Sequence, residues 1–556
     1  MRLLCFDDSN ESGSVKLEDY LHAVPNYACL SHRWNEHAED EVSYQDVIGN
    51  LKDAQTKLGY PKIPNTLKQA ATEKELTKHV WIDTCCIDKS NGAEISEEIN
   101  SMYRYYQECT VCVVYMDDVE NADPYKKGSS FRKSAWFERG WTLQELIAPP
   151  KVMFFAKDWS LIGDRNELAG LIEEITNIQQ RVLKRSSNAF DLHRFSVATK
   201  MSWAANRQTT KVEDRAYSLL GIFGINMPTI YGEGERAFER LQKKILKLTD
   251  DQSIFAWGKY RMKMSEKSVF SMIATSPDHF SGSRDIASQD YEEQVLQKYG
   301  GFPNPEYSLS NFGLKIQLLV FCVPGLTNVH LAVLKCRHQQ DTKAVVMFLG
   351  SQAKSSFAPV RHSRISFNGQ LTHITNVAHM RLELKHLWIC GTEQQLQSVV
   401  APKEVSLRFP ERYLPLDDTY PREFWRKEGT SRYITLPVGT WSTTILRDWK
   451  NNQILMAIGS IHTSVWFSFR FLRDSEIGEP VAALHEKLNI LKWNNCPSSF
   501  QVAPGKLQIQ APKRASFAGD PDTYSMTIGN REATTHGDVL DLTEEGLDVW
   551  VSLRYR

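Results

Sequence analysis

A glutamate and a tryptophan one helical turn apart are the first residues of this sequence whose types and spacing suggest chemistry. The stretch Trp136–Ala148 is predicted to be a helix, stopped by the two prolines that follow it. On this helix Glu145 shares a face with Trp141, whereas Leu143 and Ile147 point to nearly the opposite side. A carboxylate beside an aromatic ring suits a flat ring of a ligand and can stabilise positive charge. The alternative is that Glu145 is simply solvated, which is the commoner state of a helical glutamate.

Three polar or aromatic residues follow the first predicted strand, Tyr27–Ser31. They are His32, Arg33 and Trp34, and they lie where open α/β sheets bind ligands, beyond the carboxyl ends of the strands. An arginine at this position can meet a pyrophosphate. Alternatively, Arg33 pairs with an acid such as Asp83, and Trp34 belongs to the core.

Two further acids and an arginine complete the set of candidate ligand contacts. Asp83 and Asp88 follow the second predicted strand and are placed to accept hydrogen bonds from a ligand, although such acids more often cap a loop or helix. Arg139 either anchors Glu138 or Glu145 in an ion pair or approaches a phosphate. As a surface arginine it would do neither.

The cysteines and a glycine-rich turn have simpler interpretations. Cys109 and Cys112 form a CxxC without a second ligand pair nearby, so we expect buried thiols and no metal site. The other eight cysteines are scattered, which indicates reduced thiols rather than a disulfide scaffold. Gly232 and Gly234 lead into a helix, but the run lacks the P-loop ending and the GxGxxG order, so packing is favoured over phosphate binding.

The elements that must position these residues alternate between strand and helix up to about residue 160. In 94–106 the apolar residues recur at helical spacing, and Ser90 or Asn91 is available as the cap. This alternation predicts a doubly wound, largely parallel sheet. Its four predicted strands are Tyr27–Ser31, Val80–Asp83, Val111–Met116 and Lys151–Ala156.

The pattern changes twice after residue 160. Residues up to Trp257 look mainly helical, with Leu161–Ile175 and Glu235–Leu248 as the clearer helices. Beyond Trp257 the apolar residues alternate with period two, which predicts a β-rich and sandwich-like region. The clearest such stretches are Leu314–Val320, Val465–Leu472 and Val549–Tyr555.

The amino-acid composition limits the classes of molecule that this protein is expected to bind. Lys and Arg total 66 and Asp and Glu total 67 among 556 residues, so no basic excess points to nucleic acid or anionic membrane. No run of about 18 apolar residues occurs, and acids stand where a signal peptide would be apolar. We therefore expect no membrane span, a cytoplasmic location, and protein or small-molecule partners.

Four stretches carry a resemblance to a known family. Tyr27–Trp34 (YACLSHRW), His79–Tyr106 and Ser134–Phe155 resemble the blocks of the fungal heterokaryon incompatibility (HET) domain, in the family's order and spacing. Ser202–Gln242 resembles the segment that often follows that domain. Nothing comparable is recognised beyond about residue 260.

The HET domain is similar to the TIR domain, which has a flavodoxin-like sheet and in several lineages cleaves nicotinamide from NAD. The resemblance implies a TIR-like domain at 1–160, a helical extension at 161–260 and a β-rich region at 261–556. It implies that Glu145 is the catalytic carboxylate. The NAD contacts would come from Ser31, His32, Arg33, Trp34, Asp83, Arg139 and Trp141.

Two functions follow from this resemblance. The first is a cell-death effector of heterokaryon incompatibility and fungal innate immunity that self-associates through the HET domain and hydrolyses NAD, with NAD as substrate and no cofactor. The second is a non-enzymatic TIR-like module that signals by binding a partner HET or receptor protein. An unrelated enzyme in the β-rich half is a third alternative.

Overall fold

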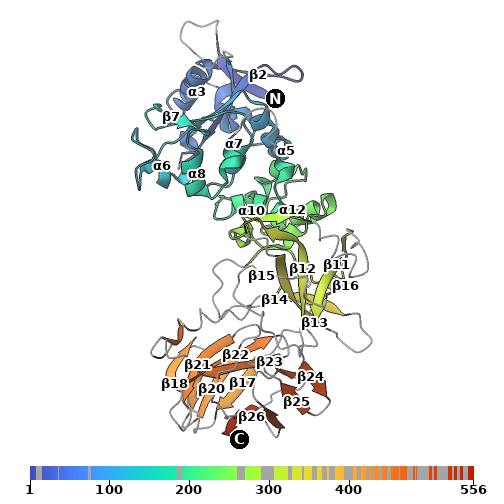
Figure 1. Ribbon diagram of the computed structural model, residues 1–556. Coiled ribbons are helices and arrows are strands. Elements are labelled where there is room, and N and C mark those ends of the chain that lie inside the picture. Colours follow the sequence, from blue (N-terminus) through green and yellow to red (C-terminus); the bar gives the residue numbers. More distant parts are fainter. Residues whose placement is uncertain are drawn as a thin grey trace. The chain divides into compact units, whose positions relative to one another are not determined.

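The computed structural model describes residues 1–7, 15–35, 37–49, 51–72, 77–184, 191–258, 269–289, 306–322, 329–340, 344–352, 360–365, 372–374 and 382–392. Beyond residue 404 it describes the strands named below and residues 422, 477, 480–482 and 484. The chain forms two compact units (Figure 1). The first comprises Met1–Thr249 with Thr275–Arg284, and the second comprises Asp250–Ala274 with Asp285–Arg556.

The first unit is built on a seven-stranded mixed sheet of order β2-β1-β4-β3-β5-β6-β7. The four central strands are parallel, and they lie where the sequence predicted strands. The outer strands are antiparallel additions that the sequence pattern did not indicate. In sheet order the strands are Val15–Asp19, Arg2–Phe6, His79–Trp81, Tyr27–His32, Val111–Tyr115, Val152–Phe155 and Leu161–Asp164.

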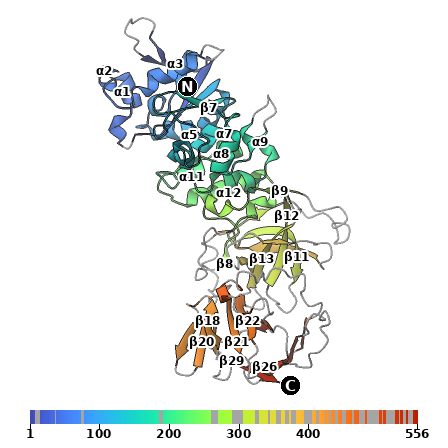
Figure 2. The same ribbon diagram turned by 60° about the vertical axis from the view of Figure 1, so that its left-hand side comes forward.

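Helices cover both faces of this sheet. Helix α3 (Lys62–Ala71) lies on one side, and α5 (Gly92–Glu108), α7 (Thr142–Ile147) and α8 (Ala169–Thr176) lie on the other (Figures 1 and 2). Strand β3 is therefore enclosed from both faces and between two neighbours, and all six of its residues are buried. A strand buried on both faces reads as a continuous apolar run, which is why YACLS was recognisable.

Helix α5 begins where the sequence allowed two caps. Asn91 is the cap: its side-chain oxygen accepts from the backbone N–H groups of Ala93, at 3.1 Å, and Glu94, at 3.4 Å. Ser90 instead donates its hydroxyl to Asp88, at 2.6 Å. The amide oxygen of Asn91 thus satisfies N–H groups that the first turn leaves unpaired.

The single helix predicted for 136–148 is wrong. A 3-10 turn, Ala135–Glu138, is followed by a break at Arg139 and Gly140 and only then by α7. The break exists because the backbone pairs with Gln208: the Gln208 N–H donates to the Glu138 carbonyl at 2.6 Å, and the Gly140 N–H donates to the Gln208 carbonyl at 2.7 Å. Long-range pairing of this kind leaves no local sequence signal.

Helix α7 is buried on every side, whereas the sequence predicted one buried face and one face toward a cleft. All six of its residues are buried, and it contacts the 3-10 turn, α5 and α9 (Gln180–Leu183). Glu145 is 8% exposed, so the alternative of a solvated glutamate is also wrong. Neighbouring helices cover the face of α7 that the sequence pattern of this helix alone predicted to be exposed.

The carboxyl end of α7 depends on Arg165. The prolines at 149 and 150 have no N–H groups, so they cannot donate to the last carbonyls of the helix. Arg165, 2% exposed, donates through Nη1 to the carbonyls of Leu146, at 2.8 Å, and Pro149, at 2.9 Å. Its Nη2 donates to the carbonyl of Pro150, at 3.0 Å. One guanidinium therefore satisfies three carbonyls at the base of the helix that carries Glu145.

The helix predicted for Leu161–Ile175 is half right. Residues Leu161–Asp164 form edge strand β7, antiparallel to β6, and the helix begins at Ala169. Asp164 marks the change, because its carboxylate accepts from the backbone N–H groups of Asn166, at 2.7 Å, and Glu167, at 2.9 Å. The later helix α12 (Arg236–Leu248) agrees with the prediction.

The segment after α8 packs closely against α5. A Cβ on Gly221 would lie 2.0 Å from the Cβ of Tyr103, so only glycine fits there. Asn100 donates its amide to the Met227 carbonyl at 3.1 Å and accepts from the Met227 N–H at 3.0 Å. Two separate contacts thus fix the region of 221–227 to a helix of the sheet domain.

The described elements of the second unit beyond residue 285 are strands. Strands β11, β16, β14, β13 and β12 pair in that order, and β12 also pairs with β11, which closes a ring. The sequence predicted a sandwich here. In this ring β12 pairs with both β11 and β13, and the β12–β13 register shifts between Val333 and Arg337. In chain order these strands are Leu314–Cys322, Val329–His338, Ala344–Gln352, Arg361–Ile365 and Glu383–Ile389.

Two further sheets lie beyond residue 404. One has the order β19-β20-β17-β29-β26-β27, with strands Trp425–Glu428, Ser431–Leu436, Val405–Phe409, Val549–Tyr555, Tyr524–Ile528 and Arg531–Thr534. The other has the order β18-β21-β22-β23-β28, with strands Pro415–Tyr420, Trp441–Arg447, Gln453–Ile461, Ser464–Phe471 and Val539–Asp541. A hairpin of Phe500–Ala503 and Lys506–Ile509 is separate from both.

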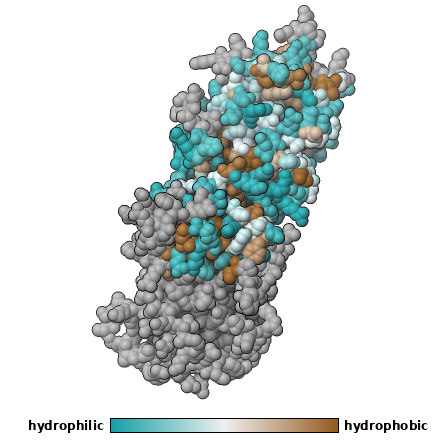
Figure 3. Space-filling model, turned by 90° about the vertical axis from the view of Figure 1, so that its right-hand side faces the viewer, coloured by the Kyte–Doolittle hydropathy of each residue, from teal (hydrophilic) through white to brown (hydrophobic). Residues whose placement is uncertain are grey.

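The cysteines of the described part are free thiols buried in the fold. Eight cysteines are described there, all buried and none in a disulfide; Cys496 and the side chain of Cys322 lie outside it. Burial raises the pKa of the Cys112 thiol well above its usual value. On the face drawn in Figure 3, hydrophobic residues are scattered among hydrophilic ones. Among the described helices, none is both long and apolar enough to cross a membrane.

Candidate functional site

The candidate residues gather beyond the carboxyl ends of three parallel strands. Ser31 and His32 end β3, Asp83 follows β4, and Asp118 follows β5. Because these strands are parallel and adjacent, their ends meet at one edge of the sheet. Two hydrogen-bonded clusters form at this edge.

The first cluster is centred on Glu145. The Ser31 hydroxyl donates to Glu145 Oε2 in a short, buried hydrogen bond. The indole N–H of Trp136 donates to the same hydroxyl oxygen, at 2.9 Å. Trp136 is fully buried against Phe154 of β6, so the chain Trp136 to Ser31 to Glu145 is held by the core.

Burial raises the pKa of Glu145 to about 7, and the negative charge of Asp83 acts in the same direction. The Ser31 hydrogen bond and the positive charges of Arg139 and Arg207 lower it, but they do not offset burial. Glu145 therefore exchanges a proton near neutral pH, as an acid or base of an active site must.

Two buried donors beside Glu145 have unused hydrogen-bonding capacity. Arg207, 4% exposed, donates to the carbonyls of Trp203, at 3.0 Å, and Arg139, at 2.9 Å, and to the Thr142 hydroxyl, at 3.0 Å. Its Nη2 has no hydrogen-bond partner among the described residues, and neither has Nε2 of Gln144. Unsatisfied buried donors are uncommon in folded proteins.

Burial lowers the pKa of Arg207 to about 10, while the charge of Glu145 raises it. The guanidinium remains protonated at neutral pH, so the site carries one fixed positive charge opposite one titratable carboxyl group.

The second cluster is centred on Asp83. His32 Nε2 lies 3.3 Å from Asp83 Oδ1, and the Trp34 indole N–H donates to Oδ2 at 2.9 Å. Lys89 places its Nζ 3.6 Å from the centroid of the Trp34 ring and 3.9 Å from Asp83. Burial alone would raise the pKa of Asp83, but Lys89, His32 and Trp34 together hold it well below its usual value. Asp83 is thus a permanent carboxylate beside an exposed aromatic ring.

The remaining candidates lie at the rim of these clusters. Arg33 pairs with Asp118, at 3.1 Å, and Asp117, at 3.8 Å, so an ion pair forms but not with Asp83. Trp34 is 42% exposed, which rules out the alternative that it belongs to the core. Arg33 is held by acids from the end of β5 because β5, not β4, brings the nearest carboxylates to its side chain.

Of the predicted site residues on and before α7, only some lie close to the Glu145 cluster. Trp141 interacts with Asp214, whose pKa is raised by burial, and so has a partner outside the Ser31 cluster. The charge of Arg139 reaches Glu145, but no ion pair of Arg139 with Glu138 or Glu145 occurs in the described part of the chain. Trp141 and Glu145 do not share a free face because α7 begins only at Thr142.

The glycine-rich turn has a packing role. The N–H groups of Gly232 and Gly234 donate to Glu213 Oε1, at 2.7 Å and 3.0 Å. The anion-binding geometry that the glycines create is therefore filled by a carboxylate of the chain itself.

Sequence reasoning missed four residues of these clusters: Trp136, Gln144, Lys89 and Arg207. Trp136 and Gln144 stand in the same block as Glu145, so a wider search of that block could have included them. Arg207 reaches the site from another segment, and nothing in its local sequence indicates this.

Glu145 makes stability depend on pH. Its pKa is about 7 in the folded chain against 4.5 ordinarily, so between these values the folded chain keeps a proton that the unfolded chain has lost. The free energy of unfolding should fall by about 3 kcal/mol as pH rises from 4.5 through 7. Urea unfolding at several pH values would measure this, and the fall should be smaller by about that amount in Glu145→Gln, because burial also raises the pKa of Glu98 to about 7 and that group contributes in both proteins. An identical pH profile for both proteins would contradict the assignment.

Two family models and one curated relative match parts of the chain. Residues 27–128 match the family model described as heterokaryon incompatibility protein (HET), and residues 236–269 match a domain of unknown function (DUF8212). The chain is 47% identical over 254 residues to the vegetative incompatibility protein HET-E-1 of Podospora anserina. This alignment covers 44% of the chain but only 18% of HET-E-1.

Solved structures add little. Two crystal structures of the Xerocomus chrysenteron lectin XCL align with 27% of the chain at 12% identity, with TM-scores of 0.17 and 0.16. At these scores the likeness carries no argument.

Proposed function

We propose, from the premise that residues 27–128 form a HET domain, that this chain is a cell-death effector of heterokaryon incompatibility that hydrolyses NAD. The products are nicotinamide and an ADP-ribose product. The domain is of TIR-like, flavodoxin-like type, and it works as a self-associated assembly.

The order of the parallel strands supports the fold proposal. In order along the chain β3, β4, β5 and β6 are first to fourth, and in the sheet they stand as β4-β3-β5-β6. This 2-1-3-4 order is that of flavodoxin-like sheets, which bind ligands where the order reverses, between the first and third strands. Ser31 and His32 end the first of these two strands.

The chemistry requires one carboxylate. When the bond between nicotinamide and ribose breaks, its electron pair leaves with nicotinamide, which becomes neutral, and positive charge develops on the ribose. Water then adds to the ribose carbon and loses a proton. A fixed carboxylate stabilises that charge or orients the water, and no acid is needed for departure.

The residues divide these tasks as follows. Glu145 acts as the carboxylate, held by Ser31. Asp83, ionised throughout, faces ribose hydroxyls, and the exposed Trp34 ring offers a surface for a base. The unpaired Nη2 of Arg207 is the donor available to an oxygen of the substrate.

The observation that carries the proposal is the buried carboxyl group of Glu145. Its pKa is about 7, and it accepts a hydrogen bond from Ser31, near the carboxyl end of strand β3. A carboxyl group in this state is unusual away from functional sites. Because Glu145 is only 8% exposed, access to it is proposed to open when protomers assemble.

The test is release of nicotinamide from NAD by the purified 556-residue chain, followed over a range of protein concentrations. Turnover per protomer should rise with concentration, because assembly is proposed to open the site. In a fungal host, induced expression should lower cellular NAD before viability falls. Absence of nicotinamide release at every concentration, with death and unchanged NAD, would reject the enzymatic function.

That same outcome would favour the second candidate, a non-enzymatic module that binds a partner HET or receptor protein. The burial of Glu145 favours it, since a carboxyl group enclosed by Ser31 and the core also suits a purely structural role. Under this alternative, Glu145→Ala would still kill cells provided that it folds.

A further inference from the structure

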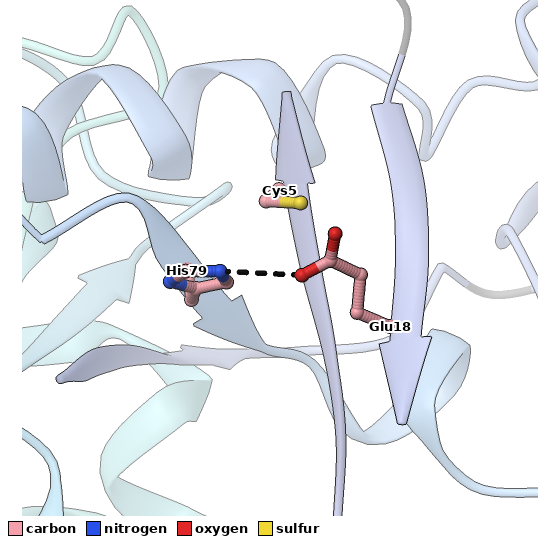
Figure 4. Close-up of side chains that lie close together, drawn as sticks. All are labelled: Cys5, Glu18 and His79. Atoms are coloured by element: carbon pink, nitrogen blue, oxygen red, sulfur yellow. Dashed lines mark ion pairs between the residues drawn. The ribbon is translucent and has the colours of Figure 1, made fainter. Parts of the chain in front are cut away.

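A thiol, a carboxylate and an imidazole meet on the outer strands of the first unit, away from the Glu145 site. Cys5 belongs to β1, Glu18 to β2 and His79 to β4. One potential ligand atom from each lies within 4.8 Å of the other two. Figure 4 shows the three side chains converging from three neighbouring strands.

The strand register brings them together. Cys5 stands opposite His79 in the β1–β4 pair and opposite Lys16 in the β1–β2 pair. Glu18 is two residues beyond Lys16, so it lies on the same face, diagonally across from Cys5. Backbone pairing thus places the three side chains on one face of the sheet.

We propose that Cys5, Glu18 and His79 bind a zinc ion. Cysteine sulfur, histidine nitrogen and a carboxylate oxygen are the three ligand types that zinc takes in proteins, at about 2.0–2.3 Å. Tetrahedral ligands at those distances are roughly 3.3–3.8 Å apart. His79 Nε2 and Glu18 Oε2 are already 3.5 Å apart, so binding needs only a small contraction.

The surroundings leave the site open to an ion. The side chains of His79 and Glu18 are 19% and 32% exposed, whereas Cys5 is buried, so the ion has access from solvent and a buried anchor. Lys16 holds the other carboxylate oxygen, Oε1, at 2.8 Å, which leaves Oε2 directed to His79. Three protein ligands leave a fourth position for water.

Tyr20 is placed to support that water. Its hydroxyl donates to Glu18 Oε2 and lies 3.1 Å from His79 Nε2. In the zinc-bound chain the same hydroxyl can hydrogen bond the bound water or the carboxylate. Groups that bond to metal ligands in this way orient them.

The expected role is to tie the β1–β2 hairpin to β4. The hairpin joins the parallel strands through only two residue pairs, Leu4 with Val80 and Cys5 with His79. A metal bridging β2, β1 and β4 would reinforce this junction, because an ion that binds only the folded chain stabilises it. This role is independent of NAD hydrolysis.

The experiment uses the 556-residue chain, stripped of metal with a chelator and titrated with zinc against a chromophoric competitor. One zinc per chain is expected. Titration with Co²⁺ should produce a thiolate-to-cobalt charge-transfer band and intense visible bands, which report a sulfur ligand in a tetrahedral site. Zinc should also raise the midpoint of thermal unfolding.

Three variants and two controls test the ligands. Cys5→Ser should abolish the charge-transfer band. Glu18→Gln and His79→Gln should each weaken zinc binding by more than about 100-fold, above the cost of losing a group that only supports a ligand. The matched controls are Cys109→Ser, another buried thiol of the first unit, and His22→Gln, an exposed histidine. Both should bind zinc as the unaltered chain does.

The outcomes separate clearly. Absence of stoichiometric zinc binding by the unaltered chain would overturn the proposal without any variant. Equal zinc affinity in His79→Gln and His22→Gln would also overturn it. Because His79 is half-buried and His22 is exposed, both variants should fold even if Cys5→Ser does not. Loss of nicotinamide release with zinc binding intact would count against the proposed function alone.

Discussion

Replacing Glu145 by glutamine is expected to lower nicotinamide release from NAD at least about 100-fold, the usual scale for loss of one positioned catalytic group. Glutamine keeps the shape of the side chain, and Ser31 can still donate to its amide oxygen. What is lost is the negative charge that stabilises the ribose cation. The loss should therefore appear in kcat, with KM little changed, and steady-state nicotinamide release measures both.

The matched control is Glu138→Gln, seven residues earlier in the same segment but exposed. Only its backbone carbonyl takes part in the pairing with Gln208, so activity should be unchanged. Turnover that survives in Glu145→Gln would remove this residue from the chemistry and leave the half-buried Asp83 as the remaining carboxylate of the site.

The second large effect is expected on stability. Replacing Arg165 by methionine should lower the free energy of unfolding of the first unit by about 3 kcal/mol or more. Methionine fills similar space but leaves the carbonyls of Leu146, Pro149 and Pro150 without their guanidinium donor, and each unsatisfied buried group costs about 1–3 kcal/mol. Scanning calorimetry should show the change in one unfolding transition, since the chain has two compact units.

Lys157→Met provides the control. Lys157 pairs with Glu120, but both side chains are at least half exposed, so the pair should contribute no more than about 1 kcal/mol. If Arg165→Met and Lys157→Met shift the transition equally, Arg165 does not support the end of α7 as described.

The central strands were predictable because each is a short, continuous apolar run enclosed on both faces. Strand β5, for example, is buried along four of its five residues. Helix α7 was misjudged for the opposite reason. Its beginning is set by backbone pairing to Gln208, 68 residues beyond Gly140, and its burial is set by neighbouring helices. Neither leaves a periodic pattern in the local sequence.

The candidate site, like the fold, was predictable from the sequence only in part. Ser31 and Glu145 were both named through the family resemblance, but no spacing argument could bring together residues 114 positions apart. Arg207, which completes that cluster, and the trio on β1, β2 and β4 are likewise products of tertiary pairing. The residues that sequence alone placed correctly are those adjacent to strand ends, such as His32 and Asp83.

The close packing of Gly221 against Tyr103 has a consequence for which gene segments can be exchanged by recombination. With Asn100 holding Met227 as well, the helical segment after residue 190 forms part of the wall of α5 and is no optional appendage. A gene fragment cut where the family match ends, at residue 128, would leave that wall bare. Recombination should therefore shuffle this domain in pieces of roughly the 254 residues shared with HET-E-1.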